Sequence, residues 1–263
     1  MRAHLVQMNI AWEDAPANHA RVEDLLGDAD IHSGDLVVLP EMFDSGFSLR
    51  TDRTADAHGH TLRCVQTLAE DLGVTIQAGR TVQACHCDKA DNRATVIGPD
   101  GTLLCEYTKI HPFSFGREPE AIRPGRRVET YRWNDNLVVC PAICYDLRFP
   151  ELFRLGLAAG AELFALGANW PDARQQHWRA LAIARAIENQ AFVLAVNRTG
   201  ADPHLNYVGG SIAVDPMGDV IAALGEEEAV LSVEIDPSVV RDWRHTFPAW
   251  RDVRLLKDGT STV

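Results

Sequence analysis

The sequence predicts an α/β fold, and two observations carry this prediction. Short apolar or β-branched runs alternate along the chain with segments of helical periodicity, and several runs are too uniformly apolar to have one face in water. Turn sequences at 98–101 and 215–219 lie between strand-like runs and indicate hairpins, so some neighbouring strands are antiparallel. A mixed sheet with helices on one face, paired to a second such sheet, satisfies both observations.

The elements follow from these patterns in chain order. Strands are expected at residues 4–10, 35–39, 74–78, 94–97, 103–107, 137–143, 162–166, 192–196, 211–214 and 230–235. Helices are expected at 16–26, 61–72, 151–159 and 173–190. No repeat, low-complexity tract or linker divides the chain, so we expect a single domain over residues 1–250. The polar tail, 251–263, is either a loose end or an arm that docks a partner.

Composition excludes several kinds of partner. The chain has 263 residues, with 25 Lys and Arg against 37 Asp and Glu, and a formal charge of −12. This charge repels phosphate backbones and anionic lipids, and no basic cluster interrupts it, so we expect neither nucleic acid nor a membrane surface as a partner. The N-terminus lacks the apolar stretch of a secretory signal, and no apolar run is long enough to span a bilayer. We therefore expect a cytoplasmic protein.

Six cysteines raise the question of which thiol is reactive. A reducing compartment and a large core argue for free thiols rather than disulfides. Cys64, Cys105 and Cys140 fall at core positions of predicted elements. The cluster Cys85-His86-Cys87 suggests zinc, but without a second ligand pair it rarely completes a four-ligand site, so we expect a hairpin tip there and no metal.

Three reactive residues follow apolar strands directly. Glu41 comes after one such run, Lys109 after another, and Cys144 after a third, where a helix begins a few residues later. Ligands of α/β proteins bind outside the carboxyl ends of the strands, so these side chains are candidates for one site.

The three side chains supply the parts for acyl transfer from an amide. A cysteine at the start of a helix is favoured as a thiolate nucleophile, and the backbone N–H of Tyr145 can point at an oxyanion. Glu41 can take the thiol proton and return it to a leaving amine, while Lys109 neutralises the developing charge. Burial raises the pKa of a carboxyl group and a nearby ammonium lowers it, so the sequence leaves the net effect on Glu41 open.

These motifs resemble those of a known family. Glu41 in LPEMFDSGF, Lys109 in YTKIH and Cys144 in ICYDLRFPE are similar to the Glu-Lys-Cys triad of the nitrilase superfamily of carbon–nitrogen hydrolases. The resemblance extends from the first strand to about Trp250. The segment 167–200 resembles in particular the omega-amidases of the YafV type, which hydrolyse 2-oxoglutaramate.

The resemblance implies more than the residue pattern does. It implies a four-layer α-β-β-α sandwich, a homodimer or larger homo-oligomer, and catalysis without a metal or organic cofactor. It also implies a second glutamate in the loop after the lysine; Glu118 and Glu120 are the candidates, and Glu118 fits the family spacing before Gly125. Its implied role is to hold Lys109 and help position a small-molecule amide substrate.

Recognition of an omega-amide of a 2-oxo acid needs a fixed cation for the carboxylate. Arg174 is the leading candidate, because arginine binds carboxylates bidentately. Phe43, Phe115 and Trp170 lie on loops next to the triad positions and are expected to form walls of the pocket.

Other interpretations remain open. Each triad residue taken alone has a structural explanation, such as a solvated acid, a surface lysine or a buried inert thiol. Arg148 is expected to brace the turn by pairing with an acid such as Glu151, and Arg185 is expected to pair with Glu188.

Rival functions also remain. The alternative chemistry is a Cys-His pair that uses His111 or His177. The alternative functions are a nitrilase, an N-carbamoyl amine hydrolase and a non-catalytic scaffold with the same fold.

Overall fold

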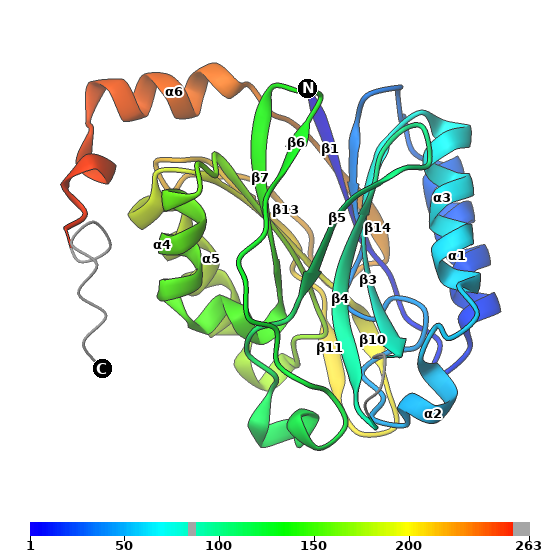
Figure 1. Cartoon of the computed structure of the whole chain (residues 1–263). Coiled ribbons are helices and arrows are strands. Elements are labelled where there is room, and N and C mark those ends of the chain that lie inside the picture. The colour runs from blue at the N-terminus through cyan, green and yellow to red at the C-terminus, as the bar shows by residue number, and fades with distance from the viewer. Residues whose placement is uncertain (84–87, 255–263) are drawn as a thin grey trace.

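Two six-stranded sheets pack face to face in the computed structural model, which describes residues 1–83 and 88–254 (Figure 1). The first sheet has the order β14-β1-β2-β3-β4-β5 and the second has the order β13-β12-β9-β8-β7-β6. In each sheet three adjacent strands are parallel, and antiparallel strands flank them. The predicted mixed sheets are thereby confirmed.

The strands of the first sheet are β1 (Arg2–Gln7), β2 (Leu36–Val38), β3 (Thr75–Gln83), β4 (Ala90–Ile97), β5 (Leu103–Thr108) and β14 (Ala229–Glu234). Those of the second are β6 (Tyr131–Trp133), β7 (Leu137–Ile143), β8 (Leu163–Ala168), β9 (Phe192–Asn197), β12 (Ile212–Val214) and β13 (Val220–Ala223). A separate hairpin consists of β10 (Thr199–Ala201) and β11 (Asn206–Val208).

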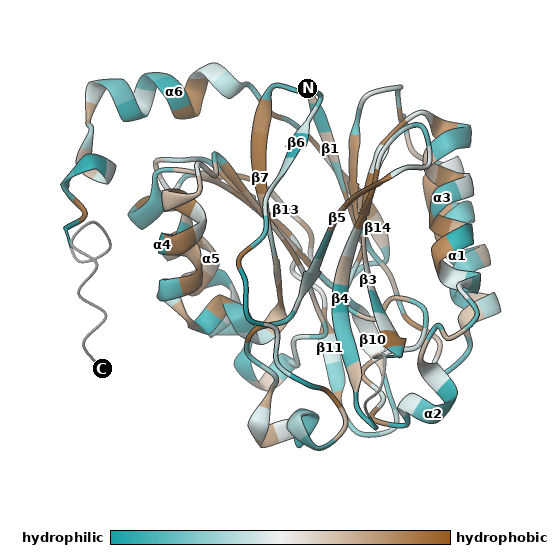
Figure 2. Cartoon of the chain, in the orientation of Figure 1, coloured by the Kyte–Doolittle hydropathy of each residue, from teal (hydrophilic) through white to brown (hydrophobic). Residues whose placement is uncertain are grey.

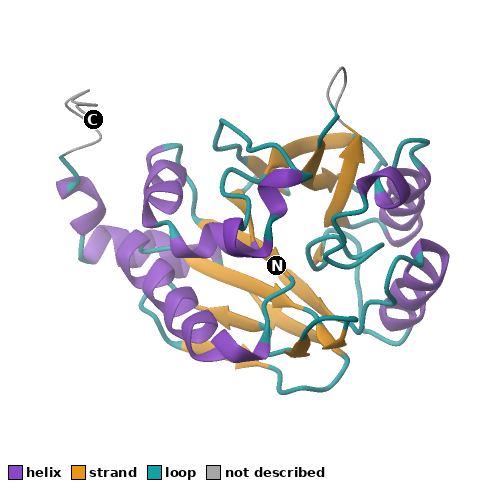
Figure 3. Ribbon diagram, turned by 90° about the horizontal axis from the view of Figure 1, so that it is seen from below, coloured by secondary structure: helices purple, strands orange, loops and turns teal. Residues whose placement is uncertain are grey.

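Helices cover the outer face of each sheet. The helices are α1 (Ala15–Gly27), α2 (Thr51–Thr54), α3 (His60–Leu72), α4 (Pro150–Ala158), α5 (Gln175–Asn189) and α6 (Pro237–Thr246). Helices α1 and α3 lie on the first sheet, and α4 and α5 lie on the second (Figure 1). Seen from below, the strands lie between helices on both sides (Figure 3). This arrangement is the four-layer α-β-β-α sandwich that the family resemblance implies.

The strands are apolar on both faces because each sheet is covered on both sides. In β2, Leu36 and Val38 pack between the two sheets, while the intervening Val37 packs with the apolar side chains of α1 and α3. Hydropathy follows the same layers, with apolar residues concentrated in the strands and polar residues on the outer helix surfaces (Figure 2). Burial of each such side chain stabilises the fold by roughly 1.5–3 kcal/mol.

The predicted elements are present, with some shifts at their ends. Both predicted hairpin turns connect antiparallel strands, β4 to β5 and β12 to β13. Sequence patterns missed β6, β10, β11, β13 and α2, which have three or four residues each, and also α6, in which Val240 is the only fully buried residue. In the described part of the chain, no helix is long and apolar enough to cross a membrane. The last nine residues of the predicted tail, 255–263, lie outside the described residues.

Two glycines let both sheets approach the segment that carries Glu41. A Cβ atom on Gly79 in β3 would lie 2.5 Å from the Pro40 oxygen and 2.6 Å from the Glu41 Cα. A Cβ atom on Gly167 in β8 would lie 2.6 Å from the Leu39 oxygen. Since β3 and β8 belong to different sheets, the backbone at Glu41 is held between the two sheets at the end of β2.

We predict that Gly79→Ala destabilises the protein by about 1–3 kcal/mol, because the new methyl group meets backbone atoms that cannot rotate away. Displacement of Glu41 should also lower turnover. Urea denaturation and steady-state kinetics measure the two effects. Gly27→Ala is the matched control, because Gly27 ends α1 and a methyl group there would have no heavy atom within 4 Å. Equal stability and activity in the two variants would contradict the close-approach argument.

Candidate functional site

The ends of β2, β5 and β7 bring the three predicted residues together. Lys109 Nζ donates hydrogen bonds to Glu41 Oε1 and to Glu118 Oε2, each at 2.8 Å. All three of these side chains are fully buried. Cys144 lies beside this cluster, and its exposed fraction of 7% faces a pocket. Glu41, Lys109 and Cys144 therefore lie together, as the strand-end argument predicts, and Glu118, which the family resemblance implies, belongs to the same cluster.

The choice between the two glutamates of the loop after Lys109 is clear from their positions. Glu118 turns inward, where it also accepts a hydrogen bond from the backbone N–H of Phe113. Glu120 is exposed and pairs with Arg117 at 2.7 Å. Glu118 is thus the residue that holds Lys109.

Two asparagines in this cluster were missed by the sequence analysis. The Asn92 side-chain nitrogen donates to Glu41 Oε1 at 2.8 Å and to Glu118 Oε1 at 2.9 Å. The Asn169 backbone N–H donates to Glu41 Oε2 at 3.0 Å. Asn169 directly follows the buried strand β8, so the strand-end argument applied there would have found it. Asn92 lies inside β4, paired with Thr81, where no strand-end signal points to it.

Cys144 occupies a strained position that a buried carboxylate braces. Its φ is +45°, in the left-handed region that non-glycine residues seldom adopt. Asp146, two residues later, accepts hydrogen bonds from the Ile143 N–H at 3.0 Å and the Tyr107 hydroxyl at 2.7 Å. Asp146 also accepts from the backbone N–H of His111, and its carboxylate lies 2.8 Å from His111 Nδ1. The turn that carries Cys144 is therefore tied to the segment that carries Lys109.

The Cys-His alternative finds no support in this geometry. His111 is bound to Asp146 and stacks on Phe149 with ring centroids 3.8 Å apart. His177 lies on the exposed side of α5, where its Nδ1 accepts from Arg148. The titratable side chain that contacts the thiol is Glu41.

The protonation states of the cluster follow from burial and shared charges. Burial alone raises the pKa of Glu41, but the Lys109 ammonium and the asparagine hydrogen bonds outweigh it and bring the pKa below its usual value. Burial, together with the charge of Glu41, raises the pKa of Glu118 despite Lys109. Burial lowers the pKa of Lys109, but the two carboxylates prevail and raise it. Lys109 is thus a permanent cation, and Glu41 is the ionised carboxylate available as a base.

The protonation state of the Cys144 thiol differs from the one expected from the sequence. Burial raises the pKa of Cys144 well above its usual range, and the negative charge of Glu41 adds to this effect more than Lys109 opposes it. The expectation that the start of the following helix stabilises a thiolate is therefore wrong for the resting site. The short 3₁₀ segment Cys144–Arg148 does not offset two buried carboxylates. The resting nucleophile is a protonated thiol beside an ionised carboxylate.

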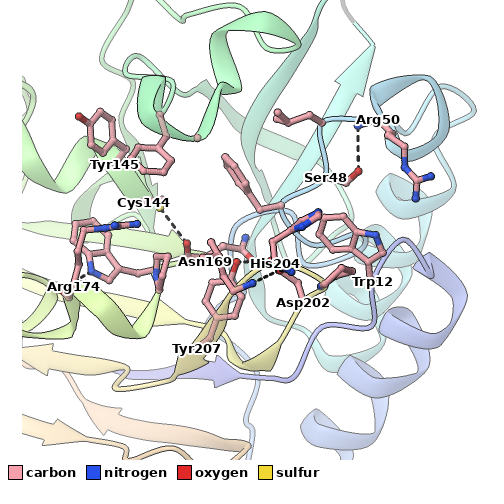
Figure 4. Close-up of a pocket in the computed structure, with 18 of the residues that line it drawn as sticks. Trp12, Ser48, Arg50, Cys144, Tyr145, Asn169, Arg174, Asp202, His204 and Tyr207 are labelled. Carbon is pink, nitrogen blue, oxygen red and sulfur yellow. Dashed lines mark hydrogen bonds between the residues drawn. The ribbon is translucent and has the colours of Figure 1, made fainter.

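A pocket of about 670 Å³ opens beside Cys144 (Figure 4). Tyr145, Cys144 and Arg174 lie on one side of it, and Trp12 and Arg50 lie on the other (Figure 4). The lining is mostly apolar and aromatic, and it consists of Trp12, Phe47, Ser48, Leu49, Arg50, Phe113, Gly116, Cys144, Tyr145, Arg148, Asn169, Trp170, Pro171, Arg174, Asp202, Pro203, His204, Leu205 and Tyr207.

Two guanidinium groups in this lining have no carboxylate partner among the described residues. Arg148 Cζ lies 4.6 Å from the centroid of the Trp170 ring, and Arg174 Cζ lies 5.5 Å from that of Phe113. Burial, together with the charge of Arg174, lowers the pKa of Arg148. The expected ion pair of Arg148 with Glu151 is absent between these two described residues, so that prediction is wrong. The two cations instead face the pocket, where an anion would relieve their mutual repulsion.

Two of the four predicted pocket residues line the pocket. Trp170 and Arg174 do so, whereas Phe43 and Phe115 do not. Phe43 packs in the core beneath α1 and α3, because the positive φ of Met42 turns the chain inward there. Phe115 is 84% exposed. The aromatic residues that line the pocket from the same two loops are Phe47 and Phe113, so the loops were identified correctly but the residues were not.

The remaining predictions concern structural residues. Arg185 pairs with Glu188 at 2.9 Å and also donates to the Leu147 carbonyl, which confirms its structural role. Cys140 and Cys105 are buried, as expected, whereas Cys64 is only half-buried. The cluster Cys85-His86-Cys87 lies outside the described residues. Within residues 1–83 and 88–254, no three His, Cys, Asp or Glu side chains are grouped so as to hold a metal ion.

Comparisons with known proteins agree with this geometry. Residues 2–245 match the carbon-nitrogen hydrolase family. A protein of Staphylococcus aureus named "Hydrolase in agr operon" is 34% identical over 97% of this chain and 98% of its own length. The 2-oxoglutaramate amidase of Bacillus subtilis is 34% identical over 95% of this chain and 96% of its own length.

A solved structure shows the same fold. The protein XC1258 of Xanthomonas campestris, described as a CN-hydrolase superfamily protein with an arsenic adduct in its active site, has a TM-score of 0.88 and 36% identity over 97% of both chains. The fold, the buried Glu-Lys-Cys cluster and these matches lead to one conclusion: the chain belongs to the carbon–nitrogen hydrolase family of the nitrilase superfamily and is a carbon–nitrogen hydrolase.

Proposed function

We propose that the enzyme is an omega-amidase, which hydrolyses the terminal amide of a small 2-oxo acid, such as 2-oxoglutaramate, to the acid and ammonia. The observation that carries this proposal is the pair of cations, Arg148 and Arg174, in the pocket that contains Cys144, neither of which has a carboxylate partner among the described residues. The similarity to a 2-oxoglutaramate amidase over nearly the whole chain supports the same substrate class.

The two arginines would determine the orientation of a substrate in the pocket. A substrate carboxylate would bind Arg174, with Arg148 adding positive charge, and the amide at the other end of the substrate would then reach Cys144. The aromatic rings beneath both guanidinium groups hold them in place. Because the chain as a whole is strongly acidic, binding of an anion depends on these local charges.

The proposed mechanism uses the cluster in two half-reactions. Cys144 Sγ attacks the amide carbon while Glu41 takes the thiol proton, and the Lys109 ammonium and the Tyr145 N–H stabilise the oxyanion. Glu41 then gives the proton to the departing ammonia, which leaves a thioester on Cys144. Glu41 next deprotonates a water molecule that attacks the thioester, and the acid leaves with the thiol restored. Glu118 holds Lys109 throughout.

Two alternative functions, those of a nitrilase and of an N-carbamoyl amine hydrolase, would use the same cluster. The third, that of a non-catalytic scaffold, would not use it. Nitriles and N-carbamoyl amines present different groups around the scissile carbon, while a non-catalytic scaffold would turn over nothing. The buried ion pair of Glu41 with Lys109, placed beside a pocket that contains Cys144, argues against a scaffold. The homo-oligomer and the cytoplasmic location expected from the sequence stay predictions.

A substrate panel tests the assignment. We expect ammonia and 2-oxoglutarate from 2-oxoglutaramate, with a higher kcat/KM than for nitriles, ureido acids or neutral aliphatic amides. Coupled detection of ammonia and 2-oxoglutarate measures the reaction, and Cys144→Ala, which should be folded and inactive, provides the blank. Preferred turnover of a nitrile or ureido acid would overturn the assignment.

Arg174→Gln tests recognition of the carboxylate. Loss of a charge-assisted hydrogen bond of about 1.5–3 kcal/mol should lower kcat/KM for 2-oxoglutaramate roughly 10- to 100-fold, mainly through KM. A neutral amide should be affected little. Arg179→Gln removes an exposed arginine of α5 and serves as the control. An equal effect on charged and neutral amides would show that Arg174 supports the structure and not the carboxylate.

Glu41→Gln should have opposite effects on ionisation of the Cys144 thiol and on turnover. Removal of the negative charge beside Cys144 lowers the pKa of the thiol, so alkylation of Cys144 by iodoacetamide near neutral pH should become faster, by about tenfold for each unit of pKa. Turnover should fall by about 10²- to 10⁴-fold because the base is lost.

Site-resolved mass spectrometry and kinetics measure the two effects. Glu120→Gln is the matched control, because this neighbouring carboxylate is exposed and pairs with Arg117. Slower alkylation in Glu41→Gln than in the wild type would contradict the electrostatic account of the thiol.

A further inference from the structure

Asn92 occupies the centre of the buried cluster, although no step of the proposed mechanism uses it. Its side chain is fully buried in β4, and its one amide nitrogen donates to both carboxylates, at 2.8 Å to Glu41 Oε1 and at 2.9 Å to Glu118 Oε1. Lys109 Nζ also contacts both carboxylates, at 2.8 Å each. The two glutamates are therefore bridged twice, once by a cation and once by a neutral amide.

The charges in this cluster do not cancel, so the second carboxylate needs a neutral donor. Glu41 and Glu118 together carry two negative charges when both are ionised, and Lys109 carries one positive charge. A buried carboxylate stays ionised when donors bind its charged form. The amide nitrogen of Asn92 has two hydrogens and can only donate, so it stabilises ionised carboxylates and no third negative charge is added.

Asn92 also distinguishes the two oxygens of Glu41. Oε1 accepts from both Lys109 and Asn92. Oε2 accepts from the Asn169 backbone N–H at 3.0 Å and lies 3.4 Å from the Asn169 side-chain nitrogen. The Asn169 carbonyl in turn lies 3.8 Å from Cys144 Sγ. Each oxygen thus accepts two hydrogen bonds, but Oε1 is bound by the Lys109 ammonium, whereas both donors of Oε2 belong to Asn169, in the segment next to the thiol.

We propose that Asn92 is a positioning residue of the reaction. By donating to one oxygen of each glutamate, it favours the ionised form of both carboxylates beside Lys109 and leaves Glu41 Oε2 as the atom that exchanges the proton with Cys144 and with the departing ammonia. This inference rests on the proposed amide hydrolysis, in which Glu41 is the base.

The other charged groups near Asn92 do not take over this role. Its neighbours in β4, Asp91 and Arg93, alternate to the opposite face of the strand, where they pair with each other at 2.7 Å. The titratable groups that face Glu41 within the cluster are Lys109, Glu118 and Cys144.

Substitution of the Asn92 side chain should leave the backbone in place. The backbone carbonyl of Asn92 accepts from the Lys109 N–H at 2.9 Å, and Asn92 pairs with Thr81 in the sheet. Neither contact uses the side chain. Asn92 is also absent from the pocket lining, so a change there should spare substrate binding.

Asn92→Asp is the decisive variant because it keeps the shape but replaces the donor with a third carboxylate. The added negative charge raises the pKa of Glu41, so the acidic limb of the pH profile of kcat/KM should move to higher pH by about one unit or more. Asn92→Ala removes the donor without adding charge, and its kcat should fall about 100-fold because Glu41 is no longer held in position. KM should change little in both variants.

Asn189 provides a matched control. Its side chain is equally buried, in α5, and donates to the Arg185 carbonyl at 2.9 Å, away from the cluster. Asn189→Asp and Asn189→Ala should lower the free energy of unfolding without moving the acidic limb of the profile. If the Asn189 and Asn92 variants lose the same activity with unchanged pH profiles, Asn92 is only structural and the proposal fails.

A second readout keeps this test separate from the substrate assignment. The negative charge in Asn92→Asp should also slow alkylation of Cys144 by iodoacetamide near neutral pH, which needs no substrate. The pH profiles use whichever amide the wild type turns over. Absence of any amide turnover by the wild type would refute the proposed function, whereas an unchanged alkylation rate in a folded Asn92→Asp variant would refute the role of Asn92.

Discussion

The buried ion pairs of Lys109 with Glu41 and Glu118 are the interactions on which the rest of the site depends. An isolated charge in the protein interior is strongly destabilising, so none of these side chains could be buried alone. The pairs form only when the ends of β2 and β5 and the loop at Glu118 all reach their native positions. Correct assembly of this end of the sandwich and correct assembly of the catalytic cluster are therefore the same event.

The two-sheet architecture supplies the close packing that this cluster needs. Gly79 and Gly167 let a strand from each sheet approach the backbone around Glu41, and Asp146 joins the turn at Cys144 to the segment after Lys109. Met42 and Cys144 both have positive φ values, so the backbone is strained next to the base and at the nucleophile. Such strain persists only where the surrounding contacts determine the position fully, and here those contacts come from both sheets.

The sequence predicted the parts of the site that strand patterns can indicate. Glu41, Lys109 and Cys144 each follow an apolar strand, and that position is visible in the order of residues. Asn92 lies within a strand, and only the register of β4 against its neighbours shows that it reaches both glutamates. Phe43 and Phe115 were misassigned because the direction of a loop side chain depends on φ and on distant contacts. Short strands such as β6 were missed because three residues carry too little periodicity.

The electrostatics of the cluster explain why the proposed substrate would need the two cations of the pocket. With both glutamates ionised, the site holds two carboxylates and one ammonium beside a neutral thiol, which gives the cluster one net negative charge. The carboxylate of the proposed substrate would come near this charge, and the net negative charge of the chain offers it no attraction. Arg148 and Arg174 place two positive charges on the pocket side of Cys144. Their charge can stay available to a ligand because no carboxylate among the described residues pairs with either of them, in contrast to Arg50 on the far side, which is paired with Glu13.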